Sequence, residues 1–489
     1  MDIQLQMAAV CQQVRYSPWI NRLGLILADI ASFTLAFILS FWLFSLWRAD
    51  GQSSLLIWFG SDTGNIRLIC FTSLMIIGIA RFWVKLRHYT YRKPFWSELR
   101  EMLLTLTMLA VLDLALVAFS KWDFSPGRWA LLWMMALLFV PLGRYLMKCL
   151  LTMVGVWQWP ALIIGCGQNA RDAYLALQSE CVMGFNIVGF VSPDDECSVS
   201  PVFGIPLLGS DVFANIESIL PMQFFLAVDY EQRELRDNWL RLLAQHGVRN
   251  VSVIPTLRGV PLYGTDISHF FSHEVLMLRI RNNLARLSSR ILKRAFDIVA
   301  SGLALLMLSP LLLYIGWKVS RDGGSPIYGH ERVGQHGRLF KCLKFRSMII
   351  NSQQVLQELL DRDPEARVEW EKDFKLKNDP RITSIGHFIR KTSLDELPQL
   401  WNVFKGEMSL VGPRPVVAAE LERYGKDAEY YLLAKPGISG LWQVSGRNDI
   451  DYDTRVYLDG WYVKNWSLWY DIAILFKTVG VVLRRDGAY

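Results

Sequence analysis

Four long apolar runs in the first third of the chain constrain its fold more than any other feature. They cover about residues 23–46, 66–83, 102–119 and 129–146. Each has about the 20 residues that an α-helix needs to cross the hydrocarbon core of a bilayer. The first run is too long for a signal peptide, and no small-residue cleavage site follows it. The sequence therefore predicts a four-helix transmembrane bundle within residues 1–156.

Basic residues between the runs indicate how this bundle is oriented. The loop between the second and third runs carries six cations, and the other two short loops are poorer in them. Cytoplasmic loops of membrane proteins are enriched in Lys and Arg. We therefore expect a multi-pass membrane protein, with everything after residue 150 in the cytoplasm. The six cations are Arg81, Lys85, Arg87, Arg92, Lys93 and Arg100.

One acid, Asp113, lies near the middle of the third run. Ionisable side chains at this depth are often functional. We favour an interhelical hydrogen bond instead, because the sequence shows no second ionisable group at a matching depth.

The composition fits a membrane protein with a large aqueous part. The 489 residues are 52% hydrophobic, and 52 Lys and Arg against 45 Asp and Glu give a net charge of +7. This charge suits anionic lipid headgroups or phosphorylated substrates. It would also suit nucleic acid, although we expect no nucleic-acid partner. Seven cysteines without a C-x-x-C pair predict reduced thiols, with no disulfide framework and no structural zinc site.

Residues 157–258 predict a Rossmann-like cytosolic domain. The stretch WPALIIGCGQNARDAYLALQ reads as a strand, a glycine turn and a helix, and further strands and a helix alternate after it. Gly165, Gly167 and Ala170 fit G-x-G-x-x-A, which lets a helix N-terminus approach a phosphate. Asp194 lies near the position of a ribose-binding acid, at a loose spacing. We favour the alternative, a structural or regulatory domain without chemistry.

A fifth apolar run follows a connecting segment at residues 259–284. Its 22 residues, 296–317, would make a straight helix about 33 Å long, which is enough to span a bilayer. However, cations flank both ends, Pro310 breaks the backbone ladder, and Ser309 can bond to a carbonyl one turn earlier. We expect a kinked, re-entrant helix at 294–318 within an α-rich domain at 285–489. The alternative is a fifth spanning helix that exports the last 170 or so residues.

The stretch RKTSLDELPQLW places Asp395 and Glu396 side by side, shortly after Arg390. Ser393 with Glu396 also fits a helix capping box, which needs no function. Phosphoryl transfer from a nucleotide diphosphate needs a metal, cations and an acceptor oxygen, and a carboxylate can be that acceptor. We expect a helix N-terminus and Arg390 to keep Asp395 ionised, and Glu396 to hold Mg²⁺. Phosphate-binding cations are abundant nearby: Arg332, Arg338, Lys341, Lys344, Arg346, Arg381, Arg390, Lys391 and Arg414.

Several motifs together resemble the monotopic phosphoglycosyl transferases. They are KFRSM, DPRIT, FIRKTSLDELPQLWNVFKGEMSLVGPRP, KPGISGLWQVSGRN and the Ser-Pro helix. The likeness covers about residues 285–489, and the membrane helices with the Rossmann-like domain, itself similar to CoA-binding-like domains, mark the large form of the family. This resemblance implies an enzyme of the bacterial inner membrane that carries out the first membrane step of O-antigen, capsule or exopolysaccharide synthesis. We expect a homodimer, with the front domains as its contact surfaces.

The resemblance also implies a two-step reaction. Asp395 attacks the sugar-bearing phosphorus of a UDP-sugar and releases UMP, and undecaprenyl phosphate then takes the phosphosugar from Asp395. Mg²⁺ is held by Asp395 and Glu396. Ser309 and Pro310 set the kink that places the domain at the inner leaflet. The substrate-binding residues are Arg390, Pro413, Arg414, Pro415 and Arg346.

Two functional alternatives stay open. Similarity over the whole chain favours UDP-galactose, but no single residue reads the C4 hydroxyl, so UDP-glucose is also possible. A non-catalytic membrane regulator of polysaccharide export is the other alternative.

The aromatic tail allows two structural interpretations, since its rings fit either a membrane interface or a core stripe. These rings are Trp461, Tyr462, Trp466, Trp469 and Tyr470.

Overall fold

A computed structural model shows two compact units, residues 1–257 and 258–489. The predicted connecting segment at 259–284 belongs to the second unit and contains the hairpin of β6 (Asp266–His269) and β7 (Leu276–Arg279). The structure describes residues 16–48, 62–120, 125–193, 197, 199–209, 222–257, 259–262, 265–269, 276–279, 283–284, 286–363, 367, 370, 376, 379–446 and 451–484.

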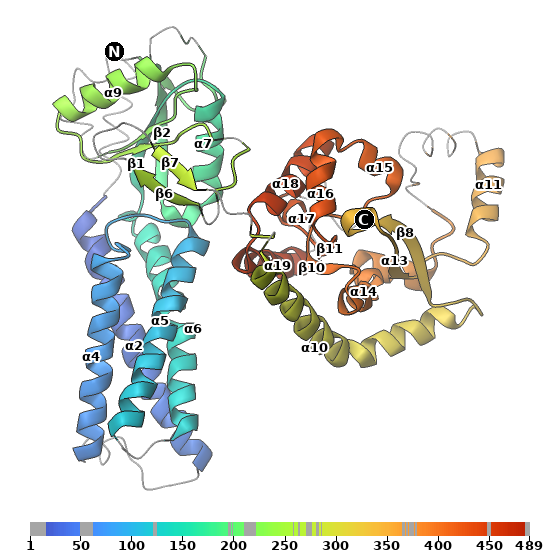
Figure 1. Ribbon diagram of the computed structural model, residues 1–489, viewed down its shortest axis with the longest axis horizontal. Helices are drawn as coiled ribbons and strands as arrows, with labels where there is room; N and C mark the ends of the chain where they lie inside the picture. Colours follow the sequence, from blue (N-terminus) through green and yellow to red (C-terminus); the bar gives the residue numbers. More distant parts are fainter. Residues whose placement is uncertain are drawn as a thin grey trace. The chain divides into compact units, whose positions relative to one another are not determined.

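Four long helices form the first part of the first unit (Figure 1). They are α2 (Pro18–Arg48), α4 (Asp62–Val84), α5 (Phe95–Ser120) and α6 (Pro126–Met153). Each contains one predicted apolar run and is long and apolar enough to cross a membrane, which confirms the four predicted helices. Helices α2 and α6 approach closely because small residues face each other. A Cβ on Gly143, for example, would lie only 2.1 Å from Ser32 Oγ.

Asp113 on α5 has an ionisable partner that we did not expect. Arg67 of α4 donates two hydrogen bonds to its carboxylate, at 2.6 and 2.7 Å, and Trp133 Nε1 of α6 donates a third at 2.9 Å. The interhelical hydrogen bond is therefore confirmed, but the expected absence of a second ionisable group was wrong. Arg67 stands at the start of its apolar run, and only the packing of α4 on α5 shows that it reaches Asp113.

Near the other end of α5, buried ion pairs join three helices. Arg144 of α6 pairs with Asp29 of α2 and with Glu98 of α5, and Lys148 also pairs with Glu98. These four residues are at most 8% exposed. Buried charges are tolerated only when they are paired in this way.

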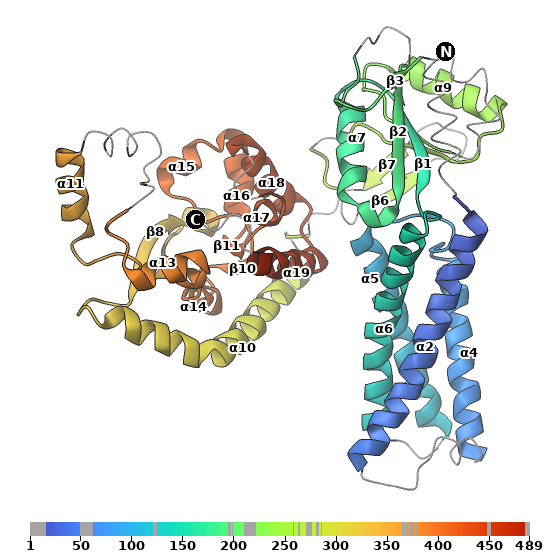
Figure 2. The ribbon, with the colours of Figure 1, turned by 180° about the vertical axis from the view of Figure 1, so that it is seen from behind.

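A five-stranded parallel sheet completes the first unit, in the order β3-β2-β1-β4-β5. Helix α7 (Gln168–Ser179) packs on one face through Ala170 and Ala173, and α9 (Arg233–Gln245) packs on the other through Trp239 and Leu243 (Figure 2). The two central strands, β1 and β4, are buried on both faces, which explains their continuous apolar runs. This confirms the predicted parallel α/β sheet. The strands are β1 (Trp159–Ile164), β2 (Phe185–Val191), β3 (Leu207–Leu208), β4 (Gln223–Leu226) and β5 (Val251–Val253).

The second unit contains a long bent helix and three small sheets. Helix α10 (Leu287–Ser320) includes Pro310 and bends visibly in Figure 1, and Ser309 Oγ donates to the carbonyl of Leu306 at 2.8 Å. Strands β8 (Ile327–Val333) and β9 (Leu339–Phe345) form an antiparallel hairpin. The remaining elements are α11 (Ser352–Arg362), α13 (Ser384–Lys391), the 3₁₀ turn η4 (Leu394–Glu396), α14 (Gln399–Lys405), β10 (Ser409–Val411), α15 (Ala418–Glu422), α16 (Ala428–Leu433), β11 (Gly437–Ser439), α17 (Leu441–Val444), α18 (Tyr452–Lys464) and α19 (Leu468–Arg484).

Both arms of α10 lie against the same globular domain. Before Pro310, Phe296 and Leu305 pack on the core that includes Val403, and after it, Ile315 packs with Phe345. The outer side of the helix is apolar and open, with more than half of each of these side chains exposed: Leu303, Leu306, Met307, Leu313 and Trp317. The domain therefore covers only one side of this apolar helix.

The aromatic tail is largely interior. Tyr462 and Trp466 are 2% and 3% exposed, and both donate hydrogen bonds to the buried carboxylate of Asp471, at 2.7 and 3.0 Å. Lys293 of α10 lies 2.7 Å from the same carboxylate. The interface interpretation was wrong for Tyr462 and Trp466, because their polar atoms close a buried network and their rings fill the core.

Candidate active site

Asp395 and Glu396 lie on the turn η4, between α13 and α14. Ser393, just before the turn, has a φ of 54°, and its side chain makes no capping hydrogen bond. The capping box is therefore absent, because an N-cap residue needs an extended backbone. A non-glycine residue at positive φ is a local strain of the kind that clusters at functional sites. Both carboxylates are half-buried.

Lys344 of β9 contacts this turn directly. Its Nζ lies 2.7 Å from Oε1 of Glu396. The hairpin register puts Tyr328 opposite Lys344 and His330 opposite Cys342, so all four side chains share one face of the hairpin. In the sequence, Lys344 is only one of many cations in this region. The alternation in KCLKF could have placed it beside Cys342, but not beside Glu396.

Burial is the largest influence on Asp395 and raises the pKa of its carboxyl, while Lys344 and Arg390 lower this pKa and Glu396 raises it. We expected Arg390 and a helix N-terminus to dominate, but the loss of water around the carboxyl outweighs them. A more basic carboxylate between two cations suits a nucleophile for an anionic phosphate.

Arg390 of α13 faces the same site with donors to spare. Its Nε donates to Ser347 Oγ at 2.8 Å, and among the described residues its two Nη groups have no hydrogen-bond partner. Behind it, Arg381 donates to the buried carboxylate of Asp379 at 2.8 and 2.6 Å. Burial raises the pKa of Asp379, but the hydrogen bonds and the charge of Arg381 lower it by more, so the pKa lies below its usual value. Arg390 is thus held by one bond and can offer a fork to a phosphate.

Arg346 has no donor left for a substrate. Its guanidinium donates all five hydrogens to the protein, and the bidentate pair with Asp322 measures 2.5 Å at both atoms. The other three bonds go to the carbonyls of Val319, Ser325 and Met348. Arg346 therefore fastens the end of α10 to β9, and the structure does not bring it to Asp395 as a free cation.

The Pro413-Arg414-Pro415 motif follows β10. Arg414 is exposed, and its guanidinium lies 5.4 Å from the centre of the Trp442 ring. The surrounding protein and Arg455 lower the pKa of Arg414, and Glu396 acts in the opposite direction. Buried polar atoms without a partner gather near it, namely Trp442 Nε1, Arg455 Nε and Asp459 Oδ1. Such atoms in a folded protein call for a water or a ligand.

Asp395 and Glu396 are candidate Mg²⁺ ligands. In the described part of the chain, no group of three or more His, Cys, Asp or Glu side chains could hold a metal. Mg²⁺ in nucleotide sites commonly uses only one or two carboxylates, together with waters and substrate phosphates. Two adjacent, half-exposed carboxylates fit this mode.

The glycine turn of the parallel sheet is filled by the protein itself. Gly165 has a φ of 140°, and a Cβ on Gly167 would lie 1.7 Å from Asp229 Oδ2. The other carboxylate oxygen of Asp229 accepts a hydrogen bond from the backbone N–H of Asn169 at 3.0 Å. A carboxylate in this position repels a phosphate, which favours the structural interpretation of the domain. Asp194 lies outside the described residues.

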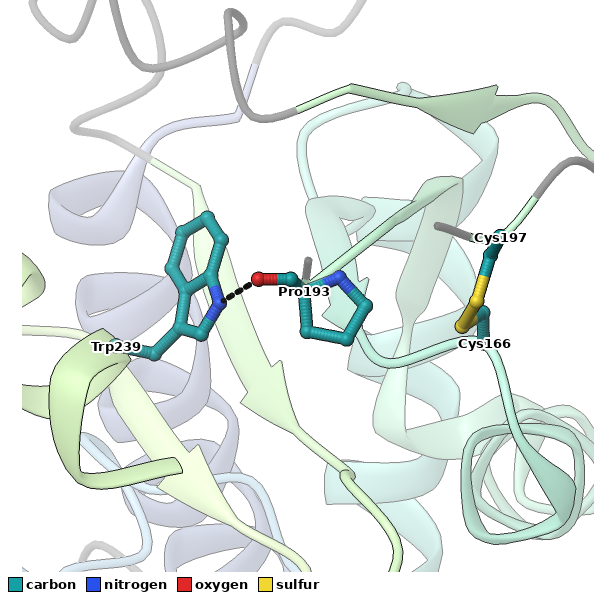
Figure 3. The surroundings of a disulfide bond; sticks show 4 residues. All are labelled: Cys166, Pro193, Cys197 and Trp239. Atoms are coloured by element: carbon teal, nitrogen blue, oxygen red, sulfur yellow. Dashed lines mark hydrogen bonds between the residues drawn. A yellow bond between two sulfur atoms is a disulfide. The ribbon is translucent and has the colours of Figure 1, made fainter. Parts of the chain in front are cut away.

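Cys166, between the two glycines, forms a disulfide with Cys197 (Figure 3). Nearby, Trp239 Nε1 of α9 donates to the carbonyl of Pro193 at 2.9 Å. The prediction of reduced thiols was wrong for this pair. The two cysteines are 31 residues apart in the sequence. Cys166 follows β1 and Cys197 follows β2, and the parallel pairing of these two strands brings the cysteines together. The free cysteines among the described residues are Cys70, Cys149, Cys181 and Cys342.

Known proteins match the chain over nearly its whole length. A family model described as bacterial sugar transferase matches residues 288–485. The UDP-galactose-lipid carrier transferase of Erwinia amylovora is 55% identical over 470 residues, which are 96% of this chain and 97% of that protein. The undecaprenyl-phosphate galactose phosphotransferase of Salmonella typhimurium is 55% identical over 476 residues, 97% of this chain and 99% of that protein. The chain belongs to the bacterial sugar transferase family.

As a bacterial sugar transferase, the chain is an enzyme of the transferase class. The matched segment begins in the first turn of α10 and includes Asp395, Glu396, Arg390 and Arg414. A further relative, the UDP-glucose:undecaprenyl-phosphate glucose-1-phosphate transferase of Escherichia coli, is 41% identical over 211 residues, 41% of this chain and 42% of that protein. The five long apolar helices among the described residues also indicate a membrane protein.

Proposed function

We propose that this transferase moves galactose 1-phosphate from UDP-galactose to undecaprenyl phosphate. The products are UMP and undecaprenyl diphosphate galactose, the first membrane-bound intermediate of an O-antigen, capsule or exopolysaccharide. The carrying observation is the half-buried Asp395 carboxylate, which stands among Lys344, Glu396 and Arg390 inside the segment shared with the family.

In the first step, a carboxylate oxygen of Asp395 attacks the sugar-bearing phosphorus of UDP-galactose. A new P–O bond to Asp395 forms, the bond from this phosphorus to the bridging oxygen breaks, and UMP leaves with the electron pair. Lys344 and Arg390 offset the negative charge that gathers on the phosphoryl oxygens. Arg414 and the orphan polar atoms near it are suited to hold the nucleotide.

In the second step, a phosphate oxygen of undecaprenyl phosphate attacks the phosphorus of the aspartyl phosphosugar. The P–O bond to Asp395 breaks, and the free carboxylate returns. The reaction is thus divided into two displacements. Neither displacement needs a general base, because both attacking groups, the carboxylate and the lipid phosphate, are already anions. Asp395 and Glu396 would hold Mg²⁺, which supplies charge neutralisation on the pyrophosphate when bound.

The bent helix supports a re-entrant placement in the inner membrane. A helix that spans the bilayer separates its two ends, whereas both arms of α10 pack on one domain. The exposed apolar side of α10 then faces the lipid, and Ser309 and Pro310 set the bend. In this proposed placement, Asp395 lies on the cytoplasmic side, where UDP-sugars are found. A homodimer stays a prediction.

Galactose is favoured over glucose by the extent of the matches. The two relatives named for galactose match at least 96% of the chain, whereas the E. coli relative named for glucose matches 41%. The first unit contributes most of this difference and contains no residue of the candidate site.

The test is a single assay with three donors. Purified protein with Mg²⁺ and undecaprenyl phosphate is given UDP-galactose, UDP-glucose or UDP-N-acetylgalactosamine, and UMP release is followed. We expect the highest kcat/KM with UDP-galactose. Without the lipid, mass spectrometry should find a hexose-phosphate adduct on the peptide that contains Asp395, and Asp395→Asn should lack it. An adduct elsewhere, or normal turnover in Asp395→Asn, would reject the mechanism, and a preference for UDP-glucose would reject only the sugar.

A further inference from the structure

A cavity of about 350 Å³ lies in the first unit, where the helix bundle meets the parallel sheet. One wall is the start of α2, with Asn21 and Arg22, and a second wall is the loop at residues 88–92 after α4. The third wall comes from Trp159, the first residue of β1, and from Asn250, which precedes β5. The volume is at the lower end of the range of small-molecule pockets. This cavity shares no residue with the filled glycine turn or with the Asp395 site.

One buried polar atom on the cavity wall lacks a partner. Asn21 is 6% exposed, and its Nδ2 donates to the carbonyl of Val156 at 2.9 Å. That bond fixes the orientation of the amide, so Oδ1 is the remaining atom, and among the described residues nothing donates to it. Buried acceptors in folded proteins almost always receive a hydrogen bond. A ligand that fits here must therefore bring a donor, such as a hydroxyl.

The charges around the cavity favour an anion. Arg22 and Arg92 line it, and no Asp or Glu is among its lining residues. Arg92 is committed to the wall, because it donates to the carbonyls of Trp157, Met183 and Gly184. Arg22 has no hydrogen bond or ion pair among the described residues, and lies 5.7 Å from the Trp19 ring centre. Its guanidinium is therefore available to a phosphate.

The remaining walls give the cavity a fixed shape. Tyr16 stacks on Trp159 with ring centres 4.9 Å apart, and Arg92 lies 4.4 Å from the centre of the Trp157 ring. His88 adds no free charge, because burial and Arg144 lower its pKa and its two ring nitrogens contact Arg144 and Glu101. The site is thus rigid and aromatic, with one free cation and one free acceptor among its described lining residues.

We propose that this cavity binds a phosphate ester with a free hydroxyl, its phosphate at Arg22 and its hydroxyl donating to Asn21 Oδ1. A lipid headgroup such as that of phosphatidylglycerol and a soluble compound such as glycerol 3-phosphate share this chemistry. The exposed apolar side chains of Trp19 and Leu23 on the same helix end place the cavity beside the membrane surface. The bound molecule touches both the bundle and the sheet, and so stabilises their junction.

The test uses full-length protein in phosphatidylcholine nanodiscs, with and without phosphatidylglycerol. Native mass spectrometry counts the phosphatidylglycerol molecules that the protein retains. Glycerol 3-phosphate is titrated into the discs of pure phosphatidylcholine, and thermal unfolding of the protein is followed. Three variants attack the site in different ways: Arg22→Gln removes the cation, Asn21→Leu removes the acceptor, and Thr90→Phe fills the space. Arg128→Gln, in the first turn of α6 at the other end of the bundle, is the matched control.

Wild type and Arg128→Gln should bind one of the two probes, with at least about a tenfold loss of affinity in Arg22→Gln and in Thr90→Phe. Retention of phosphatidylglycerol without a response to glycerol 3-phosphate in the phosphatidylcholine discs identifies a lipid ligand, and binding of glycerol 3-phosphate alone identifies a soluble one. Equal binding in all variants, or no binding of either probe to folded wild type, would overturn the proposal. UMP release should be measurable in every variant, because the site is outside the catalytic segment.

Discussion

Lys344 Nζ lies 2.7 Å from Oε1 of Glu396, and this contact joins the β8–β9 hairpin to the turn that carries Asp395. The two side chains are 38% and 36% exposed, and ion pairs so open to water add little to stability. Lys344 also lowers the pKa of Asp395, against the effect of burial. The position of this lysine is therefore better explained by the charge of the site than by the fold.

We predict that Lys344→Gln reduces UMP release by about a hundredfold or more, because a preorganised cation at the reacting phosphate is lost. The melting temperature should hardly change. Lys341→Gln is the matched control, since Lys341 lies on the same strand but on the opposite face of the hairpin. Kinetics and thermal unfolding of both variants decide the matter. A loss of stability without loss of rate in Lys344→Gln would assign the lysine to the fold.

The membrane helices and the parallel sheet were predictable because each depends on a local apolar run. The Asp395–Glu396 pair was predictable because its motif is contiguous. Lys344 was not singled out, since 52 residues separate it from Glu396 and only strand pairing brings it to the turn. Arg67 and the Cys166–Cys197 bond were missed for the same reason. Composition could also not show that all five guanidinium hydrogens of Arg346 are donated to other groups of the protein.

Arg390 and Arg346 should behave differently when each is changed to Gln. Arg390→Gln should raise KM for the UDP-sugar or lower kcat by about ten- to a hundredfold, with little change in melting temperature, because its Nη groups are free for the substrate. Arg346→Gln should instead lower stability by about 1–3 kcal/mol, because it leaves the Asp322 carboxylate and three carbonyls without their donor. Normal stability with weak substrate binding in Arg346→Gln would instead support its predicted role as a substrate ligand.

Asp459 should give the protein a characteristic pH dependence. It is 2% exposed, and burial raises its pKa from 3.8 to about 7, although Tyr424 and Arg455 act in the opposite direction. The folded state holds the proton of the Asp459 carboxyl more tightly than the unfolded state does. The contribution of Asp459 to the free energy of unfolding therefore falls as the pH rises from about 4 to about 7, and it is lowest above pH 7. Asp459→Asn should therefore be more stable than wild type at pH 8, by of the order of 2–4 kcal/mol, with little difference at pH 4. Denaturant unfolding across this range tests it, with the exposed Asp453→Asn on the same helix as control; equal gains at both pH values would contradict the assignment.

The placement of α10 can be tested from its two ends. Ser288, in the first turn of the bent helix, and Ser325, shortly after its end, are both exposed. A single cysteine at each, in a background without the native cysteines, can be labelled with an impermeant thiol reagent. If the helix re-enters, Ser288→Cys and Ser325→Cys should both react only from the cytoplasmic side, because both arms pack on one domain. Pro310→Ala restores the missing backbone hydrogen bond and should straighten the helix, so activity should fall as the arms part. Reaction of Ser325→Cys from the periplasmic side in the unmodified helix would establish a fifth spanning segment and remove the active site from the cytoplasm.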